Sequence, residues 1–192
     1  MLDTDQPGQL TATGIRADLL ATYADLISHQ SQAELESEWP QVAYIDRGTG
    51  DPLGLASIID VEKGTHRPAD APGWYDRQHA RGIKYLTVYC NRSTLPAVNA
   101  AMGKRKFFRW VATLDGTVHV PSFTPGKTPA AVQCLGAAAL GFHADLSLVY
   151  EDWWQPTPRT PADTVWVAAA LASLTRADSQ LGTLHQLLEE HK

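Results

Sequence analysis

The feature that most constrains this chain is a series of five short apolar runs with helix-forming segments between some of them. The runs are rich in β-branched and aromatic residues and are bounded by Gly, Pro, Asp or Asn, as buried strands are. They are QVAYI (41–45), ASIIDV (56–61), KYLTVYC (84–90), FRWVATL (108–114) and AAVQCLG (130–136). Strands that alternate with helices indicate an α/β fold with a mostly parallel sheet, whose working residues lie at the carboxyl ends of its strands.

Two helices are predicted between these strands. The first covers residues 71–81, where Pro72 suits the first turn of a helix. The second covers residues 93–102, where Ser93 or Thr94 can cap the helix. The segment before the first run, residues 11–38, also favours helix, because apolar side chains recur there at helical spacing and good helix formers follow. These apolar residues are Leu19, Leu20, Tyr23 and Leu26.

A change of composition near residue 157 predicts a domain boundary. The stretch QPTPRTPAD (155–163) holds three prolines, which favours an extended connector. We therefore expect one α/β domain over residues 1–157, and a linker with a C-terminal amphipathic helix over residues 158–192. Apolar residues repeat every seven positions in that helix, which is typical of a coiled-coil seam. They are Val167, Leu174, Leu181 and Leu188. The helix either packs back on the domain or associates with another copy or a virion partner through residues 161–192.

Charge and composition exclude several classes of partner. The net charge of −5 and the pI near 5.7 do not favour binding to nucleic acid or to an anionic membrane. The basic run GKRKFFR (103–109) is expected to be a solvated face. The first residues, MLDTDQPGQL, lack the features of a signal peptide, and no apolar window is long enough to span a bilayer. We expect a soluble protein that is made in a host cytoplasm.

Cysteines and histidines give no sign of a metal or a cofactor. Cys90 and Cys134 lie far apart in predicted strands, which favours two buried thiols over a disulfide. The seven histidines are never paired at the spacing of metal ligands, so we predict neither a metal site nor a cofactor.

Two acidic residues in the run IIDVEKG (58–64) are the best candidates for chemistry. Asp60 and Glu62 are two residues apart on a predicted strand, so both side chains point to the same face. Burying two carboxylates there is costly unless they are hydrogen-bonded or one keeps its proton. A protonated acid beside an ionised carboxylate is what glycoside hydrolysis needs. Alternatively, both acids are satisfied by backbone amides or by Arg47 or Arg109 and have no catalytic role.

The order of several motifs resembles the second half of the glycoside hydrolase family 25 (lysozyme-like) barrels, and looks closest to a compact branch common in actinobacteria and their phages. The motifs are IIDVEKG (58–64), RPADAPGW (67–74), TVYCNRSTLPAV (87–98), FFRWVATLDG (107–116), AAVQCLG (130–136) and FHADLSLVYEDWW (142–154). The resemblance covers roughly residues 41 to 154 and implies a compact or incomplete TIM-type (β/α) barrel.

The resemblance also implies roles for individual residues. Glu62 corresponds to the proton donor of the family, and Asp60 and Asp145 correspond to its partners. Positions that match the other strand ends of the family are expected to bind sugar; they are Tyr89, Asn91, Trp110 and Gln133. The family's first strand carries a further aspartate in a Gly-x-Asp-x-Ser setting. Here Asp18 and Asp46 are available, and neither has that setting.

Two functions remain open at this point. The first is a glycosidase that cleaves or binds the glycan of bacterial peptidoglycan, such as a phage lysin that is released at lysis. The second is a catalytically degenerate barrel that serves as a structural or assembly protein of a phage virion, in a tail or head accessory position, with residues 161–192 as the oligomerisation element.

Overall fold

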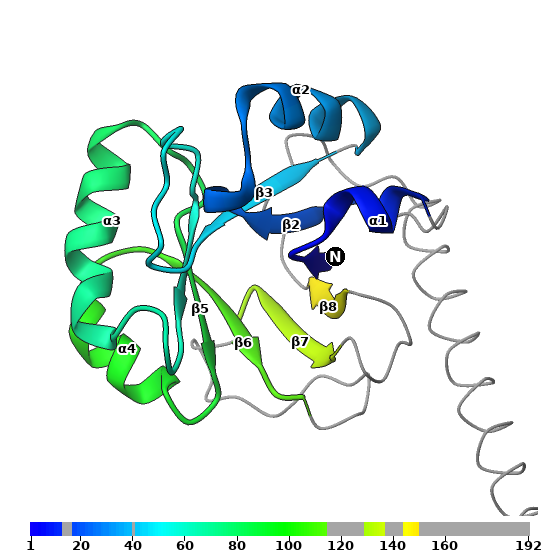
Figure 1. Cartoon of the computed structure of the whole chain (residues 1–192). Helices are drawn as coiled ribbons and strands as arrows, with labels where there is room; N and C mark the ends of the chain where they lie inside the picture. The colour runs from blue at the N-terminus through cyan, green and yellow to red at the C-terminus, as the bar shows by residue number, and fades with distance from the viewer. Residues whose placement is uncertain (13–16, 40, 115–128, 137–143, 150–192) are drawn as a thin grey trace, which may run out of the picture. The chain divides into compact units, whose positions relative to one another are not determined.

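The computed structural model describes residues 1–12, 17–39, 41–114, 129–136 and 144–149, and in it eight strands close into a barrel in chain order (Figure 1). The strands are β1 (Leu2–Thr4), β2 (Leu20–Tyr23), β3 (Val42–Asp46), β4 (Ile58–Val61), β5 (Thr87–Asn91), β6 (Phe108–Ala112), β7 (Ala131–Leu135) and β8 (Asp145–Val149). The helices are α1 (Pro7–Ala12), η1 (Ala24–Leu26), α2 (His29–Glu38), η2 (Pro68–Asp70), α3 (Ala71–Ala80) and α4 (Leu95–Met102).

Strand direction brings one end of β8 to the carboxyl ends of the other strands. Each neighbouring pair from β1 to β7 is parallel, whereas β8 is antiparallel to both β7 and β1. The first residue of β8, Asp145, is therefore paired with Asp3 near the carboxyl end of β1. This rim of the barrel is where polar side chains from distant parts of the sequence meet.

The outer face of the sheet is covered by helices. Leu20, Ile59 and Val88 belong to one buried apolar cluster that also contains residues of α2, α3 and α4, so these strand positions point outward. In Figure 1, α3 and α4 lie outside the strands, on the left of the view. Cys90 and Cys134 are both buried and unlinked, as the sequence predicted.

A second buried cluster fills the inside of the barrel. Most of its buried members are strand residues at the alternate positions, two directly precede a strand, and none belongs to the named helices; they are Leu19, Ala21, Ala43, Ile45, Ile58, Trp110, Ala130 and Ala131. Small alanines thus face a large indole, which suits a narrow barrel because the interior of a small barrel has to be filled by side chains. The alternation of strand side chains also fixes which acids point inward.

The prediction of helix over residues 11–38 was wrong in its middle. Residues 20–23 form β2, with α1 before it and α2 after it. Leu20 packs on the outer face while Ala21 packs inside, so this strand is buried on both faces. A strand of that kind has no alternation of apolar and polar residues, and its apolar run is easily mistaken for a buried helix.

The later elements agree with the sequence. Strands β3 to β7 all overlap the five apolar runs, and α3 and α4 occupy the two predicted helical segments. The predicted linker and C-terminal helix over residues 158–192 lie outside the described residues. Across the described parts of the chain, no helix is long and apolar enough to cross a membrane.

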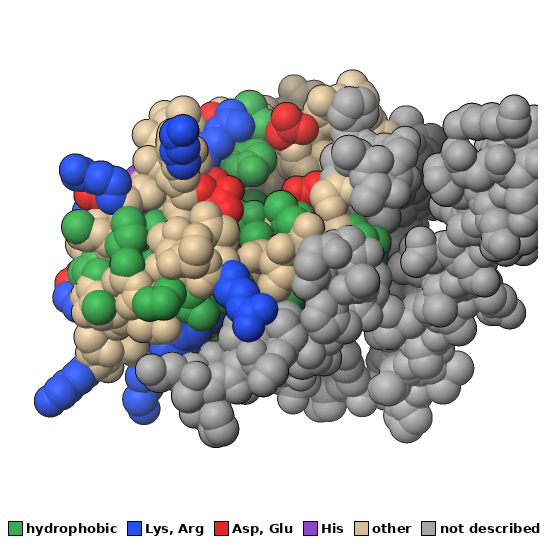
Figure 2. Space-filling model, turned by 90° about the horizontal axis from the view of Figure 1, so that it is seen from below, with side chains coloured by type: hydrophobic (Ala, Val, Ile, Leu, Met, Phe, Trp, Pro, Cys, Tyr) green, Lys and Arg blue, Asp and Glu red, His purple; other side chains and the backbone are tan. Residues whose placement is uncertain are grey.

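The basic run at 103–109 contributes to the surface, as expected. Lys104 and Lys106 are exposed, and Arg105 forms an ion pair of 2.8 Å with Asp76 of α3. In the space-filling view, several Lys and Arg side chains project from the left and lower edges of the described part (Figure 2).

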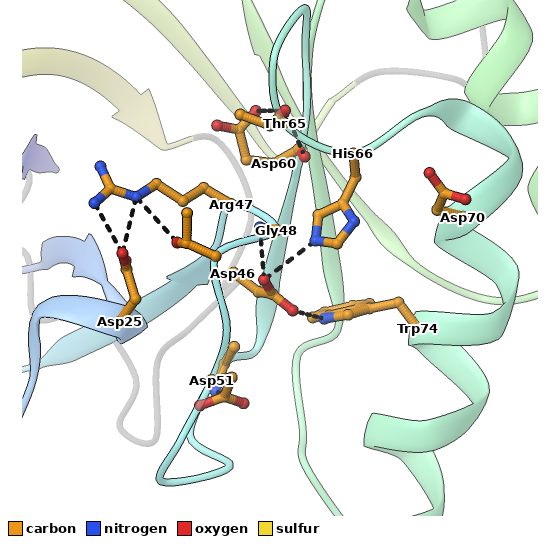
Figure 3. A network of polar contacts seen from close by, with 12 residues as sticks. Asp25, Asp46, Arg47, Gly48, Asp51, Asp60, Thr65, His66, Asp70 and Trp74 are labelled. Atoms are coloured by element: carbon orange, nitrogen blue, oxygen red, sulfur yellow. Dashed lines mark hydrogen bonds and ion pairs between the residues drawn. The ribbon is translucent and has the colours of Figure 1, made fainter.

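Asp46 joins β3 to α3 on the outer side of the barrel. Its carboxylate accepts hydrogen bonds from the Gly48 backbone N–H at 2.8 Å and from Trp74 Nε1 at 3.1 Å, and its Oδ1 lies 3.1 Å from Nε2 of His66 (Figure 3). Asp46 pairs in register with Ile59, an outward residue, so it is not one of the acids inside the barrel.

Trp74→Phe tests this connection. The substitution leaves a buried carboxylate oxygen without its donor, and we expect the free energy of unfolding to fall by about 1–3 kcal/mol. Tyr75→Phe is the control on the same helix, because the Tyr75 hydroxyl donates to the Lys106 carbonyl at an exposed site. Denaturant unfolding should separate the two variants; equal stabilities would contradict the role given to Asp46.

Candidate active site

Four acidic residues point into the barrel at the rim where the parallel strands end. Asp3 lies on β1, Asp60 on β4, Glu62 one residue beyond β4, and Asp145 at the start of β8. Asp3 and Asp145 are direct partners across the β1–β8 pair, and Asp60 pairs with Tyr89 of β5. The negative charges of the other three acids all raise the pKa of Asp3, so the four belong to one electrostatic cluster.

Asp3 is the acid that the sequence reasoning missed. It is only 8% exposed, and its Oδ2 has no hydrogen-bond partner among the residues that the structure describes. Burial raises its pKa well above the usual value, and the charge of Asp145 raises it further. The first strand of the barrel therefore carries Asp3, and neither Asp18 nor Asp46 is the acid of that strand. A strand of three residues is too short to show an alternation of apolar and polar side chains. The sequence LDTD (2–5) therefore resembles an ordinary polar chain terminus.

Asp60 is the buried member of the predicted pair. Its side chain accepts a hydrogen bond of 3.3 Å from the Thr65 hydroxyl, and the residue is 5% exposed. Burial and then the negative charge of Glu62 raise its pKa to about 7, although Thr65, His66 and Arg47 each act in the opposite direction. Asp60 therefore keeps its proton to an unusually high pH.

Glu62 is the more accessible of the two acids. The residue is of intermediate exposure, and its pKa is raised first by partial burial and then by the charge of Asp145. The charge of Glu62 in turn raises the pKa of Asp60, so of these two acids Asp60 is the one that retains its proton to about pH 7.

Gln133 connects Asp145 to β5. Its Nε2 donates a hydrogen bond to Asp145 Oδ2, and its Oε1 accepts one from the Tyr89 hydroxyl. Burial raises the pKa of Tyr89, so the phenol stays protonated and remains a donor. Since a carboxylate accepts and an amide N–H donates, Tyr89 fixes the orientation of the amide and the amide fixes Asp145.

Trp110 and Asn91 occupy different environments. Trp110 is 1% exposed, its Nε1 donates to Ser147 Oγ at 2.9 Å, and its ring centroid lies 4.6 Å from that of Tyr89. It fills the barrel beneath Tyr89. Asn91 ends β5, and its Oδ1 accepts hydrogen bonds from the Thr94 backbone N–H at 2.9 Å and from the Ser93 hydroxyl at 2.7 Å. Asn91 thus shapes the turn into α4.

Tyr23 at the end of β2 also lies at this rim of the barrel. Burial and the charges of Asp3 and Asp60 raise its pKa, which places its hydroxyl close to the acids. The guanidinium of Arg47 lies 4.6 Å from the centre of its ring and forms an ion pair of 2.8 Å with Asp25. Tyr23 was missed because its segment was interpreted as helix.

Asp60→Asn tests the protonation of the buried acid through stability. The pKa of Asp60 rises from 3.8 to about 7 on folding, so its contribution to stability is fully present below about pH 4 and is lost as the pH rises through about 7. Asn cannot ionise. We expect the free energy of unfolding of Asp60→Asn, relative to that of wild type, to increase by roughly 1–3 kcal/mol as the pH is raised from about 5 to about 8. Denaturant unfolding at the two pH values measures it.

Glu38→Gln, an exposed acid at the end of α2, is the control for that comparison. It should follow wild type at both pH values. An Asp60→Asn curve parallel to wild type would show that Asp60 ionises normally.

No group of three or more His, Cys, Asp and Glu side chains in the described part of the chain is arranged to hold a metal ion. The carboxyl cluster has what acid–base chemistry needs, namely acids with raised pKa values and ordered hydrogen-bond partners. Neither a family model nor a curated protein matches the chain.

Proposed function

We propose that the protein is a glycosidase that resembles the family 25 lysozymes, is built on a compact (β/α) barrel, and cleaves the glycan of bacterial cell walls. One observation carries this proposal: burial and the charge of Glu62 raise the pKa of Asp60 to about 7, while a further carboxyl, Asp145, lies close enough to raise the pKa of Glu62. Glycoside hydrolysis uses such a pair, an acid that stays protonated and a carboxylate that stays ionised.

Glu62 is the proton donor in this mechanism. Asp60 is too deeply buried to touch a polysaccharide, whereas Glu62 is partly exposed. When a glycan covers Glu62 and displaces water, the charged form of Glu62 is disfavoured further, so the proton that Asp60 holds passes to Glu62. From there it is given to the oxygen of the leaving sugar as the glycosidic bond breaks.

Asp145 supplies the negative charge in this mechanism. Positive charge develops on the sugar ring as the bond breaks, and a fixed carboxylate beside the ring stabilises it. The amide of Gln133 orients that carboxylate and leaves its other oxygen, Oδ1, to face Gly136, whose missing Cβ would lie 3.7 Å away. Asp60 completes the site by holding the proton that passes to Glu62.

The residues around the four acids have two kinds of role in the proposal. Tyr89 and Tyr23 are partly exposed beside the acids and present aromatic surface for a sugar ring. Trp110 and Gln133 are each 1% exposed, so they act through their neighbours, Trp110 by supporting the Tyr89 ring and Gln133 by orienting Asp145.

Glu62→Gln is the direct test of the proposed function. The amide cannot donate the proton, and we expect release of reducing sugar from purified actinobacterial peptidoglycan to fall about 10²-fold or more. Asp70→Asn is the control, because Asp70 lies in η2 and pairs with Arg67 on the surface. Full activity of Glu62→Gln would refute the assignment of the acid.

If the folded wild-type protein shows no turnover, the proposal that it is a glycosidase is wrong. The barrel would then be a binding or assembly module, as in a virion protein, and sedimentation of the full chain with cell walls would be the next comparison.

A further inference from the structure

The position of Glu62 is not fixed by the sheet. Strand β4 ends at Val61, and the paired residues of β4 and β5 end with Val61 and Cys90. Glu62 is the first residue of the loop that leads to η2, so something other than the strand ladder has to hold it against Asp60. A proton can be shared reliably only between groups whose separation is constant.

The hydroxyl of Thr65 lies between the two acids. Its Oγ1 accepts a hydrogen bond from the Glu62 backbone N–H at 2.8 Å. The same oxygen lies 3.3 Å from Asp60 Oδ1 and 3.0 Å from the Asp60 carbonyl oxygen (Figure 3). It also lies 3.1 Å from the Glu62 carbonyl oxygen. One side chain thus contacts the backbone of the proposed donor and the carboxyl group of its partner.

The loop itself is closed and anchored. The Thr65 N–H donates to the Glu62 carbonyl at 3.2 Å, and the His66 N–H donates to the Asp60 carbonyl at 3.2 Å. The His66 ring then contacts Asp46 on the outer side of the barrel, so the loop is tied to β3 as well as to β4 (Figure 3). Thr65 therefore has little freedom to turn away from Asp60.

The hydroxyl has one proton and three acceptors within reach. A carboxylate is a stronger acceptor than a carbonyl, so the proton goes to Asp60 Oδ1 when Asp60 is ionised and to a carbonyl when Asp60 is protonated. The acceptor side of the same hydroxyl stays on the Glu62 N–H in both states. The O–H of Thr65 can thus reorient as Asp60 gains or loses its proton, without any movement of Glu62.

We propose that Thr65 is a positioning residue whose hydroxyl couples Asp60 to Glu62, by holding the Glu62 backbone while its own proton follows the ionisation of Asp60. Its importance for turnover rests on the proposed function, whereas its action on Asp60 does not. Thr65 touches neither substrate nor leaving group in this account.

Other groups also act on Asp60, and the test has to leave them in place. Glu62, His66 and Arg47 influence Asp60 from the loops after β4 and β3. Asp3 on β1, Tyr23 on β2, and Tyr89 and Cys90 on β5 interact electrostatically with it from the neighbouring strands. A substitution confined to the Thr65 hydroxyl changes none of these groups.

Thr65→Val removes the hydroxyl and keeps the shape of the side chain, while Thr65→Ser keeps the hydroxyl. Both are made in the full chain, and the Asp60 carboxyl is titrated by ¹³C NMR. Loss of the donor to the ionised form should raise the pKa of Asp60 in Thr65→Val above its value in wild type, and Thr65→Ser should restore it. Thr65→Ala serves in place of Thr65→Val if the latter does not fold.

Kinetics on peptidoglycan give the second measurement. We expect kcat of Thr65→Val to fall roughly fivefold to tenfold with KM unchanged, and Thr65→Ser to keep most of the wild-type kcat. An unchanged Asp60 titration in the hydroxyl-free variants, or a kcat loss that Thr65→Ser shares equally, would overturn the proposal.

The two readouts separate this inference from the proposed function. If wild type shows no turnover and Thr65→Val still raises the pKa of Asp60, the coupling stands and the glycosidase proposal fails. If Glu62→Gln abolishes turnover and the titration of Asp60 is the same in Thr65→Val as in wild type, the reverse holds.

Discussion

The structure depends on placing four carboxyl groups at one rim of a narrow barrel. An ionised carboxylate that loses its water without a partner costs several kcal/mol, so each acid requires a separate solution. Asp3 and Asp60 have pKa values raised by burial and keep their protons to a higher pH than exposed aspartates do. Asp145 accepts the amide of Gln133, and Glu62 remains partly exposed. The result is a site in which two buried acids with raised pKa values lie beside one hydrogen-bonded acid and one partly exposed acid.

The outer face of the sheet contributes to stability, and the inner face carries the acidic residues of the candidate site. Val61 and Ile59 point outward into the apolar layer beneath the helices, which fixes β4 in place, whereas Asp60 between them points inward. Asp46 extends this arrangement, because on the outer side it holds α3 through Trp74 and lies against the ring of His66. The loop that carries Glu62 is therefore secured from outside the barrel, and the inner face is left for the acids and the aromatic side chains.

The sequence predicted the second half of the barrel better than the first. Strands β3 to β7 are apolar runs between turn residues, and Asp60 and Glu62 were found because residues two apart on a strand share a face. Strand β2 was mistaken for helix because its residues are buried on both faces, and Tyr23 was missed with it. Asp3 was missed because β1 has three residues. Its pairing with Asp145 joins positions far apart in the chain, and no local pattern reports such a contact.

Titration of the wild-type carboxyl groups by ¹³C NMR tests the central claim most directly, because it observes Asp3 and Asp60 without substrate or mutation. The account predicts that Asp60 titrates near pH 7 and that Asp3 still holds its proton well above the pH at which an exposed aspartate ionises. If every aspartate and glutamate of the folded protein ionised below about pH 5, as unperturbed carboxyl groups do, the rim would hold four ordinary charges and the proposed acid catalysis would have no physical basis.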